Sequence, residues 1–324
     1  MAFTLSDEQR ELQRGTRDFL AARLPIDKVG EMANGQADAD LWSELAELGI
    51  FHLCLEESKG GLGLSHVDAA VVFEELGRAL VPGPLIWTHL AAPWIPGAGD
   101  GSRVVAGLDT TTNLHTVTML EHLHGADEIL VLDREGVRRI EAPAIQGSAV
   151  EPPLDPLTPV YRVENLPDGE RIAGPQSAIE LGRRGALLSA AMMLGIAEAT
   201  CERGVAYAKE REQFGRPIGA FQAIKHMLAD CFVRQQLARA AVYAAAGTCD
   251  HPEVGDPSEA VSQAKILAGE AAMKNSRSSI QVHGGMGYTW EVPAHLFLKR
   301  TWVLETSFGS VEEHTDRLAD NFAA

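Results

Sequence analysis

Three long stretches in the second half of the chain constrain the fold more than any other feature. They cover residues 186–209, 221–246 and 257–282, and their apolar residues recur at three- and four-residue steps. Alanine, leucine and methionine are frequent in them, and these residues favour helix. Because consecutive long helices with short connections pack as antiparallel neighbours, we expect an antiparallel helical bundle over 176–324, with 247–256 as a loop.

The first hundred residues predict another helical domain, over 1–100. Apolar residues recur at helical spacing in 4–24, and Ser6 followed by Gln9 forms a capping-box pattern. Two more helices are expected at 41–48 and 67–80. The glycine-rich run 60–63 lacks the lysine of a phosphate loop and follows no clear strand, so we interpret it as a turn between helices.

Residues 101–175 have a different pattern. Short β-prone runs at 129–132 and 159–163 are separated by prolines and glycines, which is typical of hairpins in a small β domain. The predicted fold class is therefore mainly α with a small β domain.

Charge and cysteine usage exclude several classes of function. The net charge is −17, which argues against binding to nucleic acid or to an anionic membrane face. The four cysteines have no paired ligand spacing, so no metal site is expected, and reduced thiols predict a cytoplasmic protein. The first residues lack a signal-peptide pattern, and no uninterrupted apolar run is long enough to span a bilayer.

Two motifs at predicted helix ends carry the candidate binding residues. The first contains Arg211, Gln213 and Phe214: the guanidinium could bind a pyrophosphate with two hydrogen bonds, and the ring offers an apolar face. The second contains Gln281, followed by Gly284 and Gly285. Each motif alone could also be structural, a helix–helix turn with a surface arginine in one case and a helix cap in the other.

Together, the motifs at 211–222 and 281–288 resemble the acyl-CoA dehydrogenase family. The runs 55–61, 74–79 and 125–131 extend the resemblance over nearly the whole chain, except for a shortened middle. The resemblance implies FAD as cofactor, with both motifs reaching across a dimer interface to the ADP half of the neighbour's FAD. It places Arg211, Gln213 and Phe214 at the pyrophosphate, and Gln281, Gly284 and Gly285 at the pyrophosphate and adenosine end. His283 stands at a variable position and is expected to be a capping or surface residue.

The chain departs from this family where the chemistry takes place. The family's base is a glutamate in a turn near the C-terminus, and Phe308 stands at that position here. A minority of members place the base earlier, at a position that corresponds to Ala186. Glu305, Glu312 and Glu313 flank the turn in the wrong register. Neither the "TEPxxGSD"-like loop nor the "xxITNG"-like strand that contacts the flavin ring is found, which predicts a truncated β domain.

These departures predict a subunit without a catalytic residue of its own. The chain resembles the short, non-catalytic subunit of actinobacterial heterotetrameric acyl-CoA dehydrogenases of the steroid side-chain type. That resemblance implies an α2β2 complex with a shared FAD and an acyl-CoA substrate held mainly by the partner. Two alternatives remain open: a self-sufficient homo-oligomeric dehydrogenase with an unusual base such as Glu305 or Glu312, and a non-enzymatic scaffold of the same fold.

Overall fold

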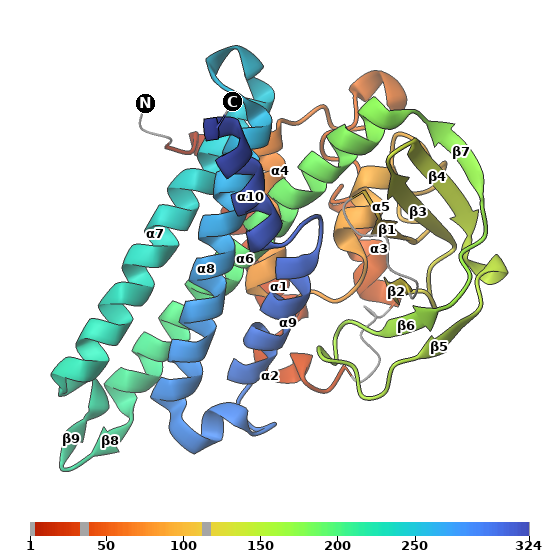
Figure 1. Cartoon of the computed structure of the whole chain (residues 1–324). Coiled ribbons are helices and arrows are strands. Elements are labelled where there is room, and N and C mark those ends of the chain that lie inside the picture. The colour runs from red at the N-terminus through yellow and green to blue at the C-terminus, as the bar shows by residue number, and fades with distance from the viewer. Residues whose placement is uncertain (1–3, 33–38, 112–117, 324) are drawn as a thin grey trace.

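The computed structural model describes residues 4–32, 39–111 and 118–323, and its N-terminal part is helical as expected (Figure 1). Ser6 caps the first helix in a complete capping box with Gln9. The run 60–63 lies in the connection between helices, as predicted. The elements are α1 (Asp7–Arg23), α2 (Ile26–Val29), α3 (Ala39–Glu47), the short 3-10 turn η1 (Glu57–Lys59), α4 (His66–Arg78) and α5 (Leu85–Ala91). The sequence patterns had not predicted α2 or α5.

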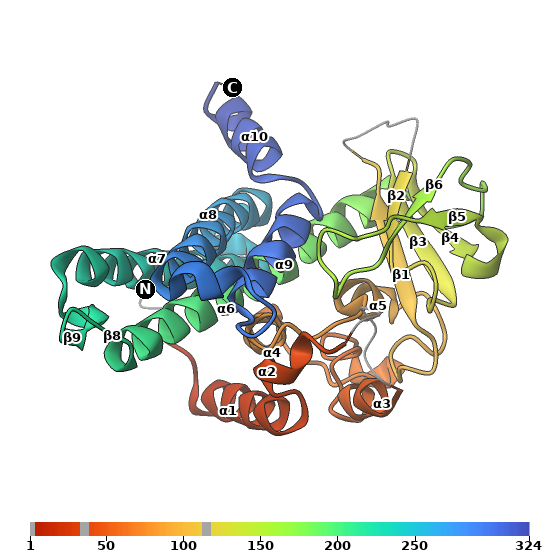
Figure 2. The same ribbon diagram turned by 90° about the horizontal axis from the view of Figure 1, so that it is seen from below.

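The middle of the chain forms two small sheets that lie beside α5 (Figure 2). One has the strand order β1-β3-β4-β7 and the other the order β2-β6-β5. The strands expected at 129–132 and 159–163 are present as β3 and β6, whereas the parallel pairing of β1 with β3 was not expected. The strands are β1 (Val105–Asp109), β2 (Thr118–Glu121), β3 (Glu128–Asp133), β4 (Gly136–Glu141), β5 (Gly147–Ala149), β6 (Val160–Val163) and β7 (Glu170–Ala173), with η2 (Ala142–Ala144) after β4.

The C-terminal part is built on three long helices, α6 (Pro175–Glu210), α7 (Gln222–Asp250) and α8 (Pro257–His283). The antiparallel bundle is thus confirmed, but α7 continues to Asp250, so the expected loop 247–256 is shorter than predicted. Two further helices, α9 (Ala294–Thr306) and α10 (Val311–Ala323), follow. Among the described residues, α6 alone is long and apolar enough to cross a membrane, but 94% of that apolar window is buried inside the fold. It is therefore a core helix.

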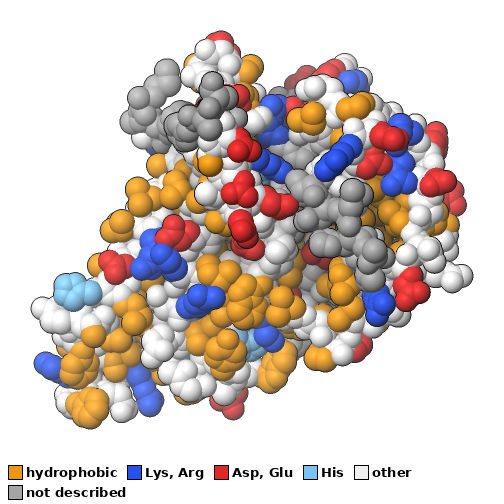
Figure 3. Space-filling model, in the orientation of Figure 1, with side chains coloured by type: hydrophobic (Ala, Val, Ile, Leu, Met, Phe, Trp, Pro, Cys, Tyr) orange, Lys and Arg blue, Asp and Glu red, His pale blue; other side chains and the backbone are white. Residues whose placement is uncertain are grey.

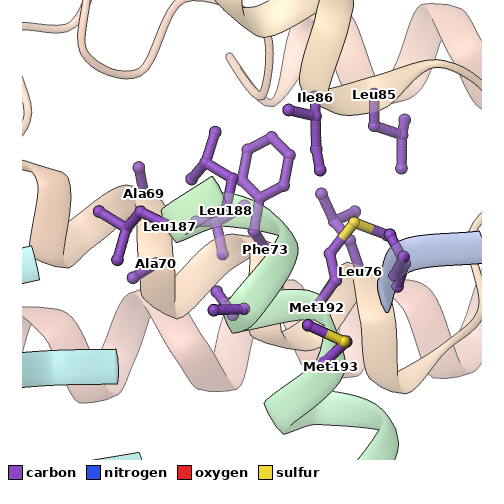
Figure 4. Close-up of a cluster of buried hydrophobic side chains, with 14 of the residues drawn as sticks. Ala69, Ala70, Phe73, Leu76, Leu85, Ile86, Leu187, Leu188, Met192 and Met193 are labelled. Atoms are coloured by element: carbon purple, nitrogen blue, oxygen red, sulfur yellow. The ribbon is translucent and has the colours of Figure 1, made fainter. Parts of the chain in front are cut away.

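The core is centred where α4 crosses α6, and Figure 4 shows side chains of both helices interlocked there. The two backbones approach closely at two glycines. A Cβ on Gly77 would lie 2.1 Å from the carbonyl oxygen of Met192, and one on Gly195 would lie 1.9 Å from that of Glu74. Met192 and Met193 are buried here, as the sequence predicted for this run. The crossing fixes α6 against the N-terminal helices. Gly185 in the first half of α6 lies against Phe308, and Arg211 follows its last residue.

Candidate functional site

The Arg211 motif forms a small hairpin at one end of the bundle (Figure 1). Strands β8 (Glu212–Gln213) and β9 (Arg216–Pro217) are joined by Phe214 and Gly215, which both have positive φ, at 53° and 78°. Two left-handed residues in a two-residue loop match the twist of a hairpin. Because a left-handed conformation is costly for a phenylalanine, the hairpin must hold this ring in place. The Phe214 side chain is 92% exposed.

The rest of the hairpin also faces solvent. Arg211 ends α6, where its amide donates to the carbonyl of Tyr207, and its side chain is exposed. The Gln213 amide donates to the carbonyl of Glu212 at 2.7 Å. Arg216 lies 4.3 Å from the ring centre of Phe221 as a cation–π pair, which fixes the base of the hairpin. The guanidinium of Arg211 is therefore accessible to a ligand brought by another molecule.

The second motif lies at the same end of the bundle. Gln281 is exposed on the last turn of α8, and Gly284 and Gly285 begin the short 3-10 helix η5 (Gly284–Tyr288). A Cβ at either glycine would meet no atom within 4 Å, so the backbone here is open to an approaching group. The structure thus brings the two predicted motifs together at the ends of α6 and α8.

His283 links these two helix ends: it is the N-cap residue of η5, in line with the capping role we expected, whereas the alternative of a surface position is wrong. The side chain is buried, not on the surface: its Nδ1 lies 2.7 Å from the carbonyl of Ser279, and its ring stacks on Tyr207 at 4.2 Å. Burial lowers the pKa of His283 below its ordinary value. A neutral, stacked imidazole fits a structural role that holds α6 and α8 in register.

Phe308 lies in the interior, in a turn between α9 and α10. Its side chain is 5% exposed and packs on Trp87 at a ring distance of 4.5 Å. On its other side lies Gly185 of α6, where a Cβ would come within 2.3 Å of the Phe308 ring. Trp87 in turn covers Gly107, where a Cβ would lie 2.2 Å from the indole. Two aromatic rings therefore fill the space between two glycines.

Polar side chains hold the turn that carries Phe308, although its φ of 57° is costly for a residue with a Cβ. Buried Lys265 donates to the carbonyls of Leu304 at 2.8 Å and of Ser307, and His314 Nε2 lies 3.1 Å from the carbonyl of Phe308. Burial lowers the pKa of Lys265 to about 7 and that of His314 to about 4. No sequence pattern indicates a role for Lys265, because a single lysine in an amphipathic helix is ordinarily a surface residue.

The acidic residues near this turn have structural partners. Glu305 accepts a hydrogen bond of 2.9 Å from the backbone amide of Val311, at the start of α10. Glu313 accepts one of 2.8 Å from the amide of Ser310. Both carboxylates thus cap the N-terminus of α10, where negative charge is favourable. Ala186 is buried and offers no acid at the alternative position.

Comparison with known proteins agrees with these motifs. Residues 6–100 match the model of the acyl-CoA dehydrogenase N-terminal domain, and residues 174–323 match that of the C-terminal domain. Acyl-CoA dehydrogenase IpdE2 of Mycolicibacterium smegmatis is 33% identical over 319 residues, which cover 96% of this chain and 98% of that protein. The chain belongs to the acyl-CoA dehydrogenase family.

Three further matches are one curated protein and two solved structures. Acyl-CoA dehydrogenase FadE34 of Mycobacterium tuberculosis is 34% identical over 93% of this chain, but the chain spans only 46% of the length of FadE34. Among solved structures, the ChsE4-ChsE5 complex from Mycobacterium tuberculosis matches with a TM-score of 0.86 at 23% identity, covering 100% of this chain and 99% of that one. A Tcur3481-Tcur3483 steroid ACAD variant matches with a TM-score of 0.83 at 25% identity, covering 99% of each chain.

Little space for a ligand remains on the Trp87 side of the Phe308 ring. One cavity at that ring, lined by Trp87, Glu121 and His122 among others, has a volume of about 50 Å³, far below the roughly 300–1,000 Å³ of ordinary ligand pockets. Burial raises the pKa of Glu121 to about 7 and lowers that of His122 to about 3. We expected no equivalent of the family's flavin-contacting strand, but β2, which ends at Glu121, lies immediately before the matched run 125–131. A strand is present there without the family's residues.

A second cavity, of about 420 Å³, borders the other side of Phe308 between α6, α8 and α10. Its lining is mixed in charge, with Arg183 and Arg317 facing Asp109, Glu259 and Asp320. The Arg211 motif is far from Phe308, which borders both cavities. At a rise of about 1.5 Å per residue, α6 separates Gly185 from Arg211 by roughly 39 Å. One extended dinucleotide with its ring at Phe308 would not reach Arg211 of the same chain.

Proposed function

We propose that this chain is the non-catalytic subunit of a heteromeric, FAD-dependent acyl-CoA dehydrogenase. A catalytic partner would supply the base, the flavin-ring pocket and most of the acyl pocket. This chain would supply Arg211, Gln213, Phe214, Gln281, Gly284 and Gly285 to the ADP half of the partner's FAD. The observation that carries the proposal is the burial of Phe308 between Trp87 and Gly185 at the position of the family's base.

The reaction of the family needs two groups that are placed opposite each other. A carboxylate removes the α proton of the acyl-CoA, and the flavin, when bound, accepts the β hydrogen as hydride. A base must reach the proton within hydrogen-bonding distance. At Phe308 no such group exists, and the nearby Glu305 is engaged with the amide of Val311. Glu313 is likewise engaged with the amide of Ser310, and Glu312 is an exposed residue of α10 outside the turn.

The hairpin that carries Arg211 is exposed, unlike buried Phe308, and its residues suit a cofactor that is shared with another subunit. Arg211, Gln213 and Phe214 are exposed, and α6 holds them far from the closed ring site. A guanidinium can bind a pyrophosphate with two parallel hydrogen bonds. Since these residues cannot serve a flavin in their own chain, a flavin whose ring lies in another subunit is the ligand that fits them.

Exposed apolar surface supports a partner subunit. Phe232, Val233 and Leu237 on α7 are each more than half exposed. In Figure 3 hydrophobic side chains also gather at the hairpin end and over the lower end of the bundle, where Tyr288 and Trp290 are exposed. Soluble monomers rarely expose contiguous apolar patches of this kind. We propose an α2β2 assembly, by analogy with the paired names of the two structural relatives, and a steroid side-chain CoA ester as one candidate substrate.

The deciding experiment is co-expression with a second dehydrogenase-like chain that has an intact glutamate, followed by counting flavins per complex. The lone chain is expected to carry little or no FAD and to turn over no acyl-CoA, and the complex to hold one FAD per catalytic subunit. Stoichiometric FAD with turnover in the lone chain would contradict the proposal and favour a self-sufficient enzyme. A chain that stays colourless with every candidate partner would favour a scaffold.

A further inference from the structure

A buried group of acidic and basic side chains joins the N-terminal helices to the bundle, away from the proposed cofactor site. It lies where α1 and α4 meet α6 and α7. The acids are Glu74, Glu75, Glu198 and Glu202, and the guanidiniums are those of Arg17, Arg78 and Arg239. The side chains of Glu74, Glu75 and Glu198 are fully or almost fully buried, whereas that of Glu202 is half exposed.

Glu74 and Glu198 are the acids that share a cation. Nη2 of Arg239 donates to Oε1 of Glu74 at 2.8 Å and to Oε2 of Glu198 at 2.9 Å. The Glu74 side chain is fully buried, and the hydroxyl of Tyr243 donates to its other oxygen. Oxygens of Glu74, Glu75 and Glu198 all lie within 4.8 Å of one another. Two ionised carboxylates this close in a dry interior repel strongly, and one bound proton converts the repulsion into a hydrogen bond.

Glu75 differs from its neighbour because it has a cation of its own. Arg17 donates to Glu75 through Nε at 2.8 Å and through Nη2 at 2.7 Å, a two-pronged pair. This pair also argues against a metal ion among the three carboxylates, because a metal would have to displace a guanidinium that already satisfies the group. Glu74 and Glu198 are therefore the two neighbouring acids that accept from one nitrogen of a single guanidinium.

We propose that Glu74 and Glu198 hold one proton between them at neutral pH, as a carboxyl–carboxylate pair that helps to attach the N-terminal helices to the bundle. The pair spans the crossing of α4 and α6, where Gly77 and Gly195 bring the two backbones into contact. Helices packed this closely cannot move apart to relieve repulsion, so the proton is needed for the native packing. The inference does not depend on the proposed function.

The pKa directions agree with this geometry. Burial raises the pKa of Glu74 to about 7, against the opposing charge of Arg239. Burial also acts to raise the pKa of Glu198, but the guanidiniums of Arg239, Arg78 and Arg17 outweigh it and lower that pKa. The proton therefore resides mainly on Glu74. The other groups that face the pair are Glu75 of α4, Glu202 of α6 and the neutral hydroxyl of Tyr243 of α7.

The consequence for stability has a definite sign. The unfolded chain releases the Glu74 proton near the ordinary value of 4.5, whereas the folded chain keeps it to about 7. Between these values the folded state binds more protons, so this pair makes the free energy of unfolding fall as pH rises. Buried histidines such as His314 contribute the opposite slope, so the pair is best measured against a matched variant.

The matched variant is Glu74→Gln, whose amide copies the shape and hydrogen bonding of the protonated acid. Urea midpoints of the full chain would be compared at about pH 5 and about pH 8. The midpoint of the wild type is expected to fall relative to that of the variant between these values. Glu75→Gln is the control: it breaks the pair with Arg17 and should lower the midpoint by a similar amount at both pH values.

Infrared spectroscopy detects the proton directly and does not need the variant to be stable. The wild-type chain is expected to show the C=O stretch of a protonated carboxylic acid at neutral pH, which should disappear as the pH rises above about 7. Buried Glu121, whose pKa is also raised to about 7, contributes to the same band, so Glu74→Gln should weaken the band by about the share of one carboxyl group and Glu75→Gln should leave it unchanged. An absent band in the wild type, or a Glu74→Gln variant with the same pH dependence as the wild type, would overturn the proposal.

Discussion

Two phenylalanines share an unusual backbone conformation and have opposite surroundings. Phe308 has a φ of 57° and Phe214 a φ of 53°. Phe308 is 5% exposed and packed against Trp87, whereas Phe214 is 92% exposed at the tip of a hairpin. The buried ring is stabilised by its packing, which offsets the backbone strain. The exposed ring receives little such compensation within its own chain, so a residue held this way at a surface suggests a contact with another molecule.

The comparison explains how this fold could retain cofactor binding without catalysis. In the first half of α6, Phe308 and Trp87 fill the space beside Gly185. The C-terminal end of α6 presents an arginine, an amide and an exposed ring to solvent. A few large side chains, with glycines beside them, are enough to fill the space around Phe308. The exposed hairpin that carries Arg211 does not depend on that packing.

The largest expected effect is on stability, from truncating the buried ring. Phe308→Ala should lower the free energy of unfolding by about 3–5 kcal/mol, because it leaves a cavity beside Trp87. Phe214→Ala is the matched control and should change it by less than about 0.5 kcal/mol. Urea denaturation of the two variants measures the difference. Equal effects would mean that Phe308 does not pack in the core.

The next effect is on cofactor affinity in the assembled complex. Arg211→Ala should weaken FAD binding about ten- to a hundredfold, since a hydrogen bond to a charged group contributes roughly 1.5–3 kcal/mol. Arg211→Lys should recover only part of the loss, because an ammonium lacks the two-pronged fork. An FAD titration of the apo-complex is the measurement, and turnover at saturating FAD should approach that of the wild type. Unchanged affinity would leave Arg211 a plain surface residue.

A smaller effect on the free energy of unfolding tests how closely Phe308 packs against α6. Gly185→Ala should destabilise the chain by about 1–3 kcal/mol, because the added Cβ overlaps the ring. Gly182→Ala is the control on the same helix. Its Cβ would lie 3.7 Å from Asp109, an ordinary contact, so this variant should gain about 0.5–1 kcal/mol from its better helix propensity. Thermal unfolding of both variants would show whether they shift in opposite directions.

The smallest expected effect is on activity, where we predict no change. Phe308→Glu should produce no acyl-CoA turnover in the lone chain, because a base has no use without a flavin ring opposite the substrate. A dye-reduction assay with a panel of acyl-CoA esters would measure this. Measurable turnover without a partner would show that the region around β2 can hold a flavin, and that our proposal of a chain without its own flavin-ring pocket is wrong.

Much of the fold could be predicted from local sequence pattern. The three long helices of the bundle, the capping box at Ser6 and the strand at 129–132 follow from apolar spacing and short-range hydrogen bonding. The pairing of β1 with β3 could not be predicted this way, because a parallel pair joins segments that are separated along the chain. The helices α5, α9 and α10 were also missed. In α9 buried residues occupy most of the helix, so it lacks a clear one-sided pattern.

The sequence by itself determined which residues stand at the positions of the two motifs and that Phe308 replaces an acid. It could not show that Phe308 would be enclosed by Trp87, Gly107 and Gly185, because these residues come from separate segments and meet only when α6 crosses the sheet. The same holds for Lys265 beneath the turn and for Glu74 beside Glu198. Periodicity reports which face of an element is buried, whereas tertiary packing alone decides which buried groups become neighbours and thus how they ionise.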